Sequence, residues 1–473
     1  MSLNNISTVV IITSSAGGGH ITGAEAVRKQ MQRECLEGES FKFVMVDLLE
    51  DWLPGFMGKY FARRWNLAQI RGNVASLHWM ANRQRFIDAL LFLSVYYSCS
   101  RMLRTLRPDR FVDTQPLATG AIMRAICRYN ATFRRHREKE LCLEKVMTDP
   151  PTQGATHFLS RIRRLTDSQR SLVRVMSIRP LLKNGESNAD FWKKRAGLDE
   201  SQVKIVDHFA REEFFPYIKC QEKISQLFFA LDLDQVAYLS KALQGSAQYS
   251  FQKTGVSLTL KNTDLLFLFL LGTNPPEKAL IAYLSSLAEV CSHSNRTVHA
   301  VICCGSALNL PTEILTTFAS LPSSLYLLPL PMQKAEFLAP LMHRSDLRVT
   351  KSGGSTTMEL LATVRARAEK GEGGEIWIHS EEKQISGIAA WEKDNAAYLQ
   401  QAIKQTKLVT PETCSLFLED FFARLDRKKD SVHSEQQASH AGFQLGEKAR
   451  FESVGCAEKV QNGAVISGKS RQD

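Results

Sequence analysis

The chain has 473 residues, of which 44% are hydrophobic, enough for two domains that each bury a core. Its formal net charge is +11, and no run of about 18 apolar residues occurs, so we expect no membrane-spanning helix. The ten cysteines form no Cys-x-x-Cys pair, which argues against a structural zinc site and against a disulfide scaffold, and favours reduced thiols in the cytoplasm.

The first expected element is a buried strand at residues 8–13, because the run is short, β-branched and apolar. A glycine turn, Gly17, Gly18 and Gly19, follows it, and a helix is expected over residues 21–30. Glycines allow the backbone to approach a ligand, and a helix N-terminus attracts anions. His20 stands at the start of this helix and is expected to face the ligand. The alternative is that the glycines only form a tight turn and His20 caps the helix.

Residues 56–110 interleave basic and aromatic side chains. The apolar run at residues 86–97 is interrupted by Asp88, so we expect a core helix there. The basic residues allow three interpretations: a solvated helical face, a nucleic-acid surface, or docking on an anionic membrane surface. No nucleic-acid recognition motif accompanies them, so no nucleic-acid partner is expected. The residues concerned include Lys59, Arg63, Arg64, Trp65, Arg71, Trp79, Arg83, Arg85 and Phe86.

Further along the chain, the strand at residues 146–149 ends in Asp149. A change of domain is expected after the strand at residues 203–206, which divides the chain into residues 1–214 and 215–425. Residues 217–260 are expected to be helical and to lead into the second sheet, whose apolar strand at residues 265–271 ends in a Gly272-Thr273-Asn274 turn. The polar tail, residues 426–473, is expected to be disordered.

A second strand, glycine turn and helix occupy residues 345–361. Ser355 and Thr356 can cap the helix or bind a phosphate oxygen. Glu359 lies one turn later, where it can accept hydrogen bonds from the vicinal hydroxyls of a ribose. The alternative is a simple capping arrangement in which Glu359 complements the helix dipole. The two similar units predict an α/β protein with two facing domains and a ligand between them.

These segments, taken in order through residues 7–405, resemble the monogalactosyldiacylglycerol synthase and diacylglycerol glucosyltransferase group. They are also similar, more distantly, to the lipid-linked N-acetylglucosaminyltransferase of peptidoglycan synthesis. The resemblance implies the GT-B fold, in which two Rossmann-like domains face each other across a cleft. The matching segments are Ser15-Ala16-Gly17-Gly18-Gly19-His20, Val46-Asp47-Leu48-Leu49, Thr114-Gln115-Pro116-Leu117-Ala118-Thr119-Gly120-Ala121, Val146-Met147-Thr148-Asp149, residues 345–359 and residues 392–399.

The sequence departs from this family at several positions. Trp391 stands where the family usually has Gln, and Asp394 replaces a glycine. A charged insertion at residues 365–374 replaces a proline-rich strand. The turn at residues 272–275 lacks the expected run of glycines. We therefore expect a modified donor pocket.

The resemblance implies transfer of a hexose from a UDP-sugar to a lipid hydroxyl such as that of diacylglycerol, with inversion and without metal or cofactor. In this interpretation His20 is the base, Asp149 assists it, and the Gly17–Gly19 turn lies on the acceptor side. The enzyme would be cytoplasmic and peripheral on the inner face of a membrane. The alternatives are a UDP-sugar epimerase and a degenerate binding or effector protein on the same scaffold. The donor-binding residues would be Lys351, Ser352, Gly353, Gly354, Ser355, Thr356, Glu359, Glu392 and Asn395.

Overall fold

The computed structural model describes residues 5–15, 19–34, 39–133, 139–153, 156–206, 210–244, 246–381 and 389–427. It divides into one unit that ends at Cys414 and a second that begins at Ser415. Residues 415–427 are helical, so the expected disorder of the tail does not begin at residue 426; residues 428–473 lie outside the described residues. The fold below is that of the first unit.

The first domain is built on six parallel strands in the order β2-β1-β3-β4-β5-β6. Val9 to Ile12 of β1 are fully buried and alternate between two core clusters on the two faces of the sheet, as the apolar run predicts. The strands are β1 (Asn5–Thr13), β2 (Glu39–Asp47), β3 (Arg110–Asp113), β4 (Leu143–Val146), β5 (Val173–Ser177) and β6 (Val203–Ile205). The helices are α1 (Gly19–Arg33), α2 (Leu48–Asp51), α3 (Gly55–Ile70), α4 (Val74–Asn82), α5 (Gln84–Leu106), α6 (Thr119–Phe133), α7 (Thr156–Arg163), α8 (Asp167–Arg170), α9 (Asn188–Ala196), η1 (Glu200–Gln202) and η2 (Glu212–Tyr217).

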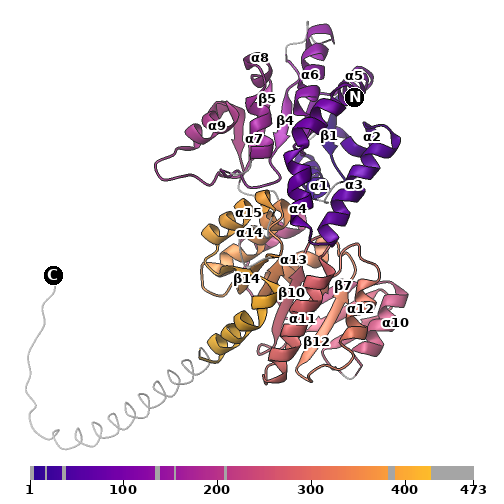
Figure 1. Ribbon diagram of the computed structural model, residues 1–473, viewed down its shortest axis with the longest axis vertical. Coiled ribbons are helices and arrows are strands. Elements are labelled where there is room, and N and C mark those ends of the chain that lie inside the picture. The colour runs from indigo at the N-terminus through magenta and orange to yellow at the C-terminus, as the bar shows by residue number, and fades with distance from the viewer. Residues whose placement is uncertain are drawn as a thin grey trace, which may run out of the picture. The chain divides into compact units, whose positions relative to one another are not determined.

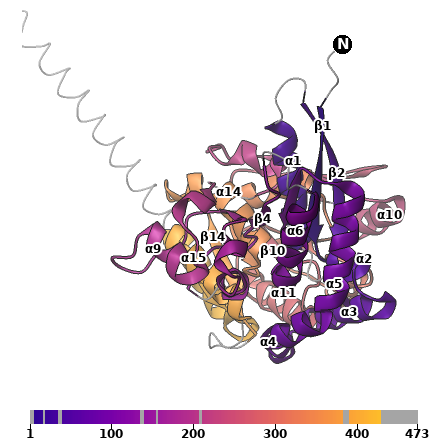
Figure 2. The same cartoon turned by 90° about the horizontal axis from the view of Figure 1, so that it is seen from above.

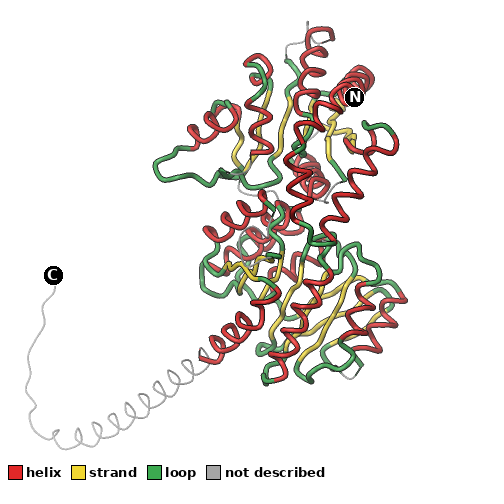
Figure 3. Tube along the Cα trace, in the orientation of Figure 1, coloured by secondary structure: helices red, strands yellow, loops and turns green. Residues whose placement is uncertain are grey.

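The second domain has a parallel sheet in the order β12-β11-β10-β13-β14-β15. Helices cover it, and Figures 1 and 3 show the two α/β domains, so the expected GT-B architecture of two Rossmann-like domains is confirmed. The predicted boundary after residue 214 falls within η2. The strands are β10 (Leu265–Leu270), β11 (Val298–Cys303), β12 (Leu325–Leu330), β13 (Leu347–Thr350), β14 (Glu375–His379) and β15 (Thr406–Val409). The helices are α11 (Glu277–Ser292), α12 (Leu310–Thr317), α13 (Ala335–Arg344), α14 (Gly354–Ala368), α15 (Ala390–Ala402) and η4 (Pro411–Thr413).

The helical expectation for residues 217–260 is wrong for most of this segment. It folds as β7 (Gln226–Ala230), α10 (Leu233–Ala242), β8 (Tyr249–Gln252) and β9 (Gly255–Thr259), with the strands in the antiparallel order β7-β9-β8. Leu227 and Phe229 of β7 are buried at alternate positions, which is the period of a strand with one buried face. Pairing with β9 therefore determines the conformation of β7.

Helix α5 packs against α6 in the first domain, as Figure 2 lets the reader follow, and places Leu91, Val95, Cys99 and Leu103 in the core. This confirms a core helix, but only on one face. By length and composition alone, residues 86–106 would suffice to cross a membrane, whereas the sequence analysis expected no such helix. Only 22% of this apolar stretch is buried. A second stripe at helical spacing is solvent-exposed, and we call it the outer stripe of α5: Phe86, Leu90, Leu93 and Tyr97.

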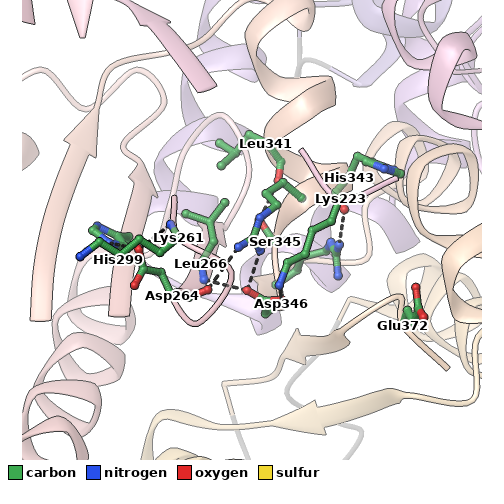
Figure 4. A network of polar contacts seen from close by, with 12 residues as sticks. Lys223, Lys261, Asp264, Leu266, His299, Leu341, His343, Ser345, Asp346 and Glu372 are labelled. Atoms are coloured by element: carbon green, nitrogen blue, oxygen red, sulfur yellow. Dashed lines mark hydrogen bonds and ion pairs between the residues drawn. The ribbon is translucent and has the colours of Figure 1, made fainter. Parts of the chain in front are cut away.

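A partly buried polar network joins the amino-terminal ends of β10 and β13 (Figure 4). The Asp346 carboxylate accepts hydrogen bonds from the Leu266 amide at 2.9 Å and from Arg344 Nη1 at 2.7 Å, and forms an ion pair with Lys223 Nζ at 3.3 Å. Because these strands are parallel, the network lies at the edge opposite the glycine turn that follows β13. Its role is to hold this end of the sheet together.

Candidate functional site

A cavity of about 210 Å³ lies at the carboxyl ends of β10 and β13, where the strand order of the second sheet reverses. In open α/β sheets this switch point is the usual place for a ligand. The second domain lines the cavity with the turns after β10, β11, β12 and β13, and with Glu359 and Glu392. Gly19, Thr22, Gln69 and Arg211 complete the lining from the first domain and the linker that follows it. We call it the switch-point cavity.

The glycine turn after β13 presents a helix N-terminus to this cavity. Gly353 is the N-cap residue of α14, and no side chain there accepts a hydrogen bond from the first turn. The Ser355 hydroxyl donates instead to the Gly19 carbonyl oxygen of the first domain, at 3.1 Å. The capping alternative for Ser355 is therefore not what the structure shows. The first turn of α14 keeps amide groups and a positive dipole end for an anion, and Gly353, Gly354, Ser355 and Thr356 all line the cavity.

Lys351 brings a positive charge to the same wall. Among the described residues, its ammonium group makes no hydrogen bond and no ion pair, and Lys351 lines the cavity. Burial lowers the pKa of Lys351, while the carboxylates of Glu392 and Glu381 oppose that shift. Burial likewise raises the pKa of Glu392, which Lys351 opposes. A cation that lines the cavity and forms no ion pair within bonding distance is suited to neutralise an anionic ligand.

Glu359 also lines the cavity, but it already has a partner. Arg211 Nε donates to Glu359 Oε1 at 2.7 Å, and the Glu359 side chain is 4% exposed. Burial raises the pKa of Glu359, and Arg211 opposes the shift. A ribose would therefore share this carboxylate with Arg211. The sequence analysis did not identify Arg211 as a residue of the site. The one signal for it is its position between β6 and η2, where the chain passes from the first domain to the second.

His20 is held by the loop that follows β3. Its Nδ1 lies 2.9 Å from the Thr114 carbonyl oxygen and 3.4 Å from the Thr148 hydroxyl. A carbonyl oxygen only accepts hydrogen bonds, so Nδ1 carries the proton and the basic lone pair of the neutral ring lies on Nε2. The ring also makes an edge contact with Phe158, whose centroid is 6.4 Å away. His20 follows Gly19, which lines the cavity, whereas His20 itself does not.

Asp149 and Asn395 form a contact between the domains. The Asn395 amide group donates to Asp149 Oδ1 at 2.9 Å and to the Ser352 carbonyl oxygen at 2.8 Å. Asn395 is fully buried, so it joins the two domains beside the cavity and does not line it. Ser352 also lies outside the lining, and its hydroxyl donates to the Glu392 carbonyl oxygen at 2.8 Å.

The Trp391 side chain packs between the domains. Its ring stacks on Trp65 of α3, with the centroids 5.5 Å apart and the planes 22° apart. Nearby, the Asn274 amide donates to Gln69 Oε1 at 3.5 Å, and Ser306 donates to Asn274 Oδ1 at 2.7 Å. The sequence analysis missed Gln69 and Asn274 as cavity residues. The turn that follows β10 pointed to Asn274, but no signal pointed to Gln69.

Two glycines of the predicted site cannot be placed. Gly17 and Gly18 lie outside the described residues, and of that turn the structure describes Gly19. Within the described part of the chain, no group of three or more His, Cys, Asp or Glu residues could hold a metal ion.

Comparison with solved structures finds distant likenesses along most of the chain. MurG from Acinetobacter baumannii is 14% identical, with a TM-score of 0.46, over 88% of this chain and 90% of that one. A putative UDP-N-acetylglucosamine 2-epimerase from Listeria monocytogenes is 11% identical, with a TM-score of 0.41, over 89% of each chain. The glycosyltransferase SsfS6 from Streptomyces sp. SF2575 is 8% identical, with a TM-score of 0.42, over 86% of this chain and 89% of that one. At these values the likenesses do not assign a reaction. No family model and no curated protein matches the chain.

Proposed function

We propose that this protein transfers a hexose from a UDP-sugar to a lipid hydroxyl, with inversion at the sugar carbon. The observation that carries the proposal is the wall of the switch-point cavity, where the uncapped first turn of α14 and the Lys351 ammonium lie together. A departing nucleoside diphosphate develops negative charge, and fixed amide dipoles and a cation stabilise that charge. Glu359 then offers an acceptor for the ribose hydroxyls, next to the diphosphate.

The proposed base is His20. It abstracts the proton of the acceptor hydroxyl through Nε2, because the Thr114 carbonyl oxygen holds the proton on Nδ1. Asp149 lies in the loop after β4 of the first domain and accepts a hydrogen bond from Asn395 of the second domain, whose amide group also donates to the Ser352 carbonyl oxygen. Its proposed part is therefore to keep the two domains in register for transfer, and the direct support of His20 comes from Thr114.

The size of the cavity implies that the domains open to admit the donor. Small-molecule sites usually have volumes of about 300–1,000 Å³, whereas this cavity measures about 210 Å³. The Ser355–Gly19 and Asn395–Asp149 hydrogen bonds cross the cleft at its floor and would break on opening. The structure thus corresponds to the closed state of the proposed enzyme.

The lipid acceptor is proposed from the surface of α3, α4 and α5. The outer stripe of α5 is 56–69% exposed, and Phe56 and Trp79 add aromatic rings that are 80% and 56% exposed. Lys59, Arg63 and Arg64 are exposed on α3. Large exposed apolar patches mark interaction sites, and basic residues beside one favour an anionic bilayer. We therefore propose that the enzyme works on a membrane surface, at its cytoplasmic face.

The test is UDP release by the full chain from several UDP-sugars, with and without vesicles that contain diacylglycerol. The proposal expects release that depends on the lipid, together with a glycolipid product. A change in the sugar without any lipid would indicate the epimerase alternative. No turnover, with UDP still bound, would indicate a degenerate binding protein, which the use of Trp391 and Asn395 in domain contacts also favours.

The matched variants are Lys351→Ala and Lys393→Ala. Both changes remove one positive charge. They differ in place, because Lys351 lines the cavity, whereas Lys393 lies on α15 outside the lining. The proposal expects only Lys351→Ala to weaken the binding of UDP. Equal loss in both variants would show that net charge, and not the cavity, attracts the nucleotide.

A further inference from the structure

A second cavity, of about 440 Å³, lies in the first domain between α7 and α9. It shares no lining residue with the switch-point cavity. We call it the arginine cavity. Its lining residues are Gln153, Leu159, Ser160, Arg163, Arg164 and Arg195.

The three arginines of this cavity differ from Arg161 of α7 and Lys193 of α9. Among the described residues, none of the three guanidinium groups makes a hydrogen bond, an ion pair or a ring contact. By contrast, Arg161 of α7 pairs with Asp88, and Lys193 of α9 pairs with Asp199 at 2.7 Å. The guanidinium groups without a carboxylate are those that surround the cavity. Arg163 and Arg164 are exposed and Arg195 is partly buried, so water screens much of their mutual repulsion, and an anion in the cavity could pair with all three.

Two buried polar atoms in the lining also lack a partner in the described part of the chain. They are Arg195 Nε, a donor, and Gln153 Oε1, an acceptor. The amide nitrogen of Gln153 already donates to Glu186 Oε2 at 3.1 Å, which fixes the oxygen as the unpaired atom. Buried donors and acceptors are normally satisfied by protein or by a bound molecule. A ligand for this cavity would therefore both accept and donate hydrogen bonds.

We propose that the arginine cavity binds a phosphomonoester. Its oxygens accept from several guanidinium forks at once, which is the geometry in which arginine recognises phosphate best. A protonated phosphate oxygen, or a hydroxyl beside the ester, donates to Gln153 Oε1. The volume is larger than a bare phosphate needs, and the Leu159 side chain offers apolar contact to the group that carries it.

The site shares one loop with the contact between the domains. Gln153 belongs to the same loop after β4 as Asp149, which accepts the hydrogen bond from Asn395 of the second domain. A phosphomonoester that binds Gln153 would restrain that loop and so favour the domain contact. This inference does not depend on the proposed transfer reaction.

The experiment measures binding directly, by titration calorimetry on the full chain. Inorganic phosphate and glycerol 3-phosphate are the soluble probes, and vesicles whose lipid ends in a phosphomonoester are compared with vesicles of phosphodiester lipid at equal charge. All titrations use the Lys351→Ala background, so that phosphate held at the switch-point cavity does not contribute. We expect saturable binding that Arg195→Ala and Arg163→Ala each weaken by about tenfold or more.

The matched control is Lys194→Ala, which removes a charge from the residue before Arg195 on the same helix and outside the lining. It should change the affinity by less than about twofold. Arg195→Lys, which keeps the charge but removes the fork, should bind weakly. Binding by soluble probes alone indicates a metabolite, and binding by the phosphomonoester vesicles indicates a lipid headgroup. Absence of saturable binding, or equal losses in Lys194→Ala and Arg195→Ala, would overturn the proposal; thermal melts verify that each variant is folded.

Discussion

Gly354 is the residue at which a single methyl group should separate the two domains. An ideal Cβ on Gly354 would lie 2.1 Å from the Thr148 carbonyl oxygen and 2.6 Å from Asp149 Oδ1, both in the first domain. The nearer atom belongs to the backbone, so no side-chain rotation relieves the overlap. Gly354→Ala therefore requires the loop after β4 and the start of α14 to move apart.

The size of the effect follows from these distances. A carbon–oxygen contact normally measures about 3.3 Å or more, so the two segments must separate by about 1 Å. The cross-domain hydrogen bonds of Ser355 and Asn395, at 3.1 and 2.9 Å, would then exceed bonding distance. Overpacking of this kind costs about 1–3 kcal/mol, which lowers the closed-to-open equilibrium constant by roughly 5- to 150-fold. Alanine also favours the helix by up to about 1 kcal/mol, so the domain itself should not lose stability.

The stacked pair Trp65 and Trp391 reports on closure, because one indole belongs to each domain. We expect Gly354→Ala to change the tryptophan fluorescence and the near-ultraviolet circular dichroism, with little change in the far-ultraviolet spectrum or in the melting temperature. The matched control is Gly353→Ala. Nothing lies within 4 Å of a Cβ at Gly353, and its φ of −64° suits any residue, so this variant should match the wild type.

Two outcomes would refute this reasoning. If Gly354→Ala leaves the tryptophan signal unchanged, the domains do not close through the contact at Thr148. If Gly353→Ala changes the signal as much as Gly354→Ala does, the effect comes from the flexibility of the glycine turn and not from the contact between the domains.

The other predictions concern the base, the donor site, the membrane and the core. His20→Ala should lower turnover by roughly 100-fold while UDP binds as before, and unchanged turnover in a steady-state assay would remove its role as the base. Glu359→Ala should weaken UDP binding by about 1–3 kcal/mol, whereas the control Glu313→Ala, on α12, should not. If calorimetry gives Glu359→Ala the same affinity for UDP as the unchanged protein, the proposed ribose contact is wrong. Serine at all four positions of the outer stripe of α5 should abolish sedimentation with anionic vesicles while UDP binding is retained, and full sedimentation would exclude this surface. Burial lowers the pKa of His299 to about 4, so the stability of the fold is not reduced by this residue above about pH 6.5 and falls by up to about 3 kcal/mol as the pH drops to 4. Urea unfolding should therefore show a shallower pH dependence in His299→Gln. An equal slope in the two proteins would mean that folding does not lower the pKa of His299.

Much of the framework of the site could be predicted from the sequence, because its signals are local. A short β-branched run followed by glycines, as at residues 8–19, combines a strand propensity with a turn that few other residues allow. The same holds for the strand, glycine turn and helix at residues 345–361, which place Lys351 and Glu359 at the cavity. Such patterns depend on neighbours within one or two turns of the chain, so they do not require knowledge of the fold.

The tertiary structure decided which distant groups meet. Residues 226–230, 249–252 and 255–259 form strands because β7 and β8 pair with β9, a stabilisation that their local composition does not reveal. Ser355 and Gly19 are 336 positions apart, and Asn395 and Asp149 are 246 apart, yet each pair shares a hydrogen bond. Ser355 and Asn395, which were expected to bind the donor, therefore form contacts between the domains. The arginine cavity is likewise a product of folding, because the approach of α7 and α9 brings Arg195 beside the adjacent residues Arg163 and Arg164.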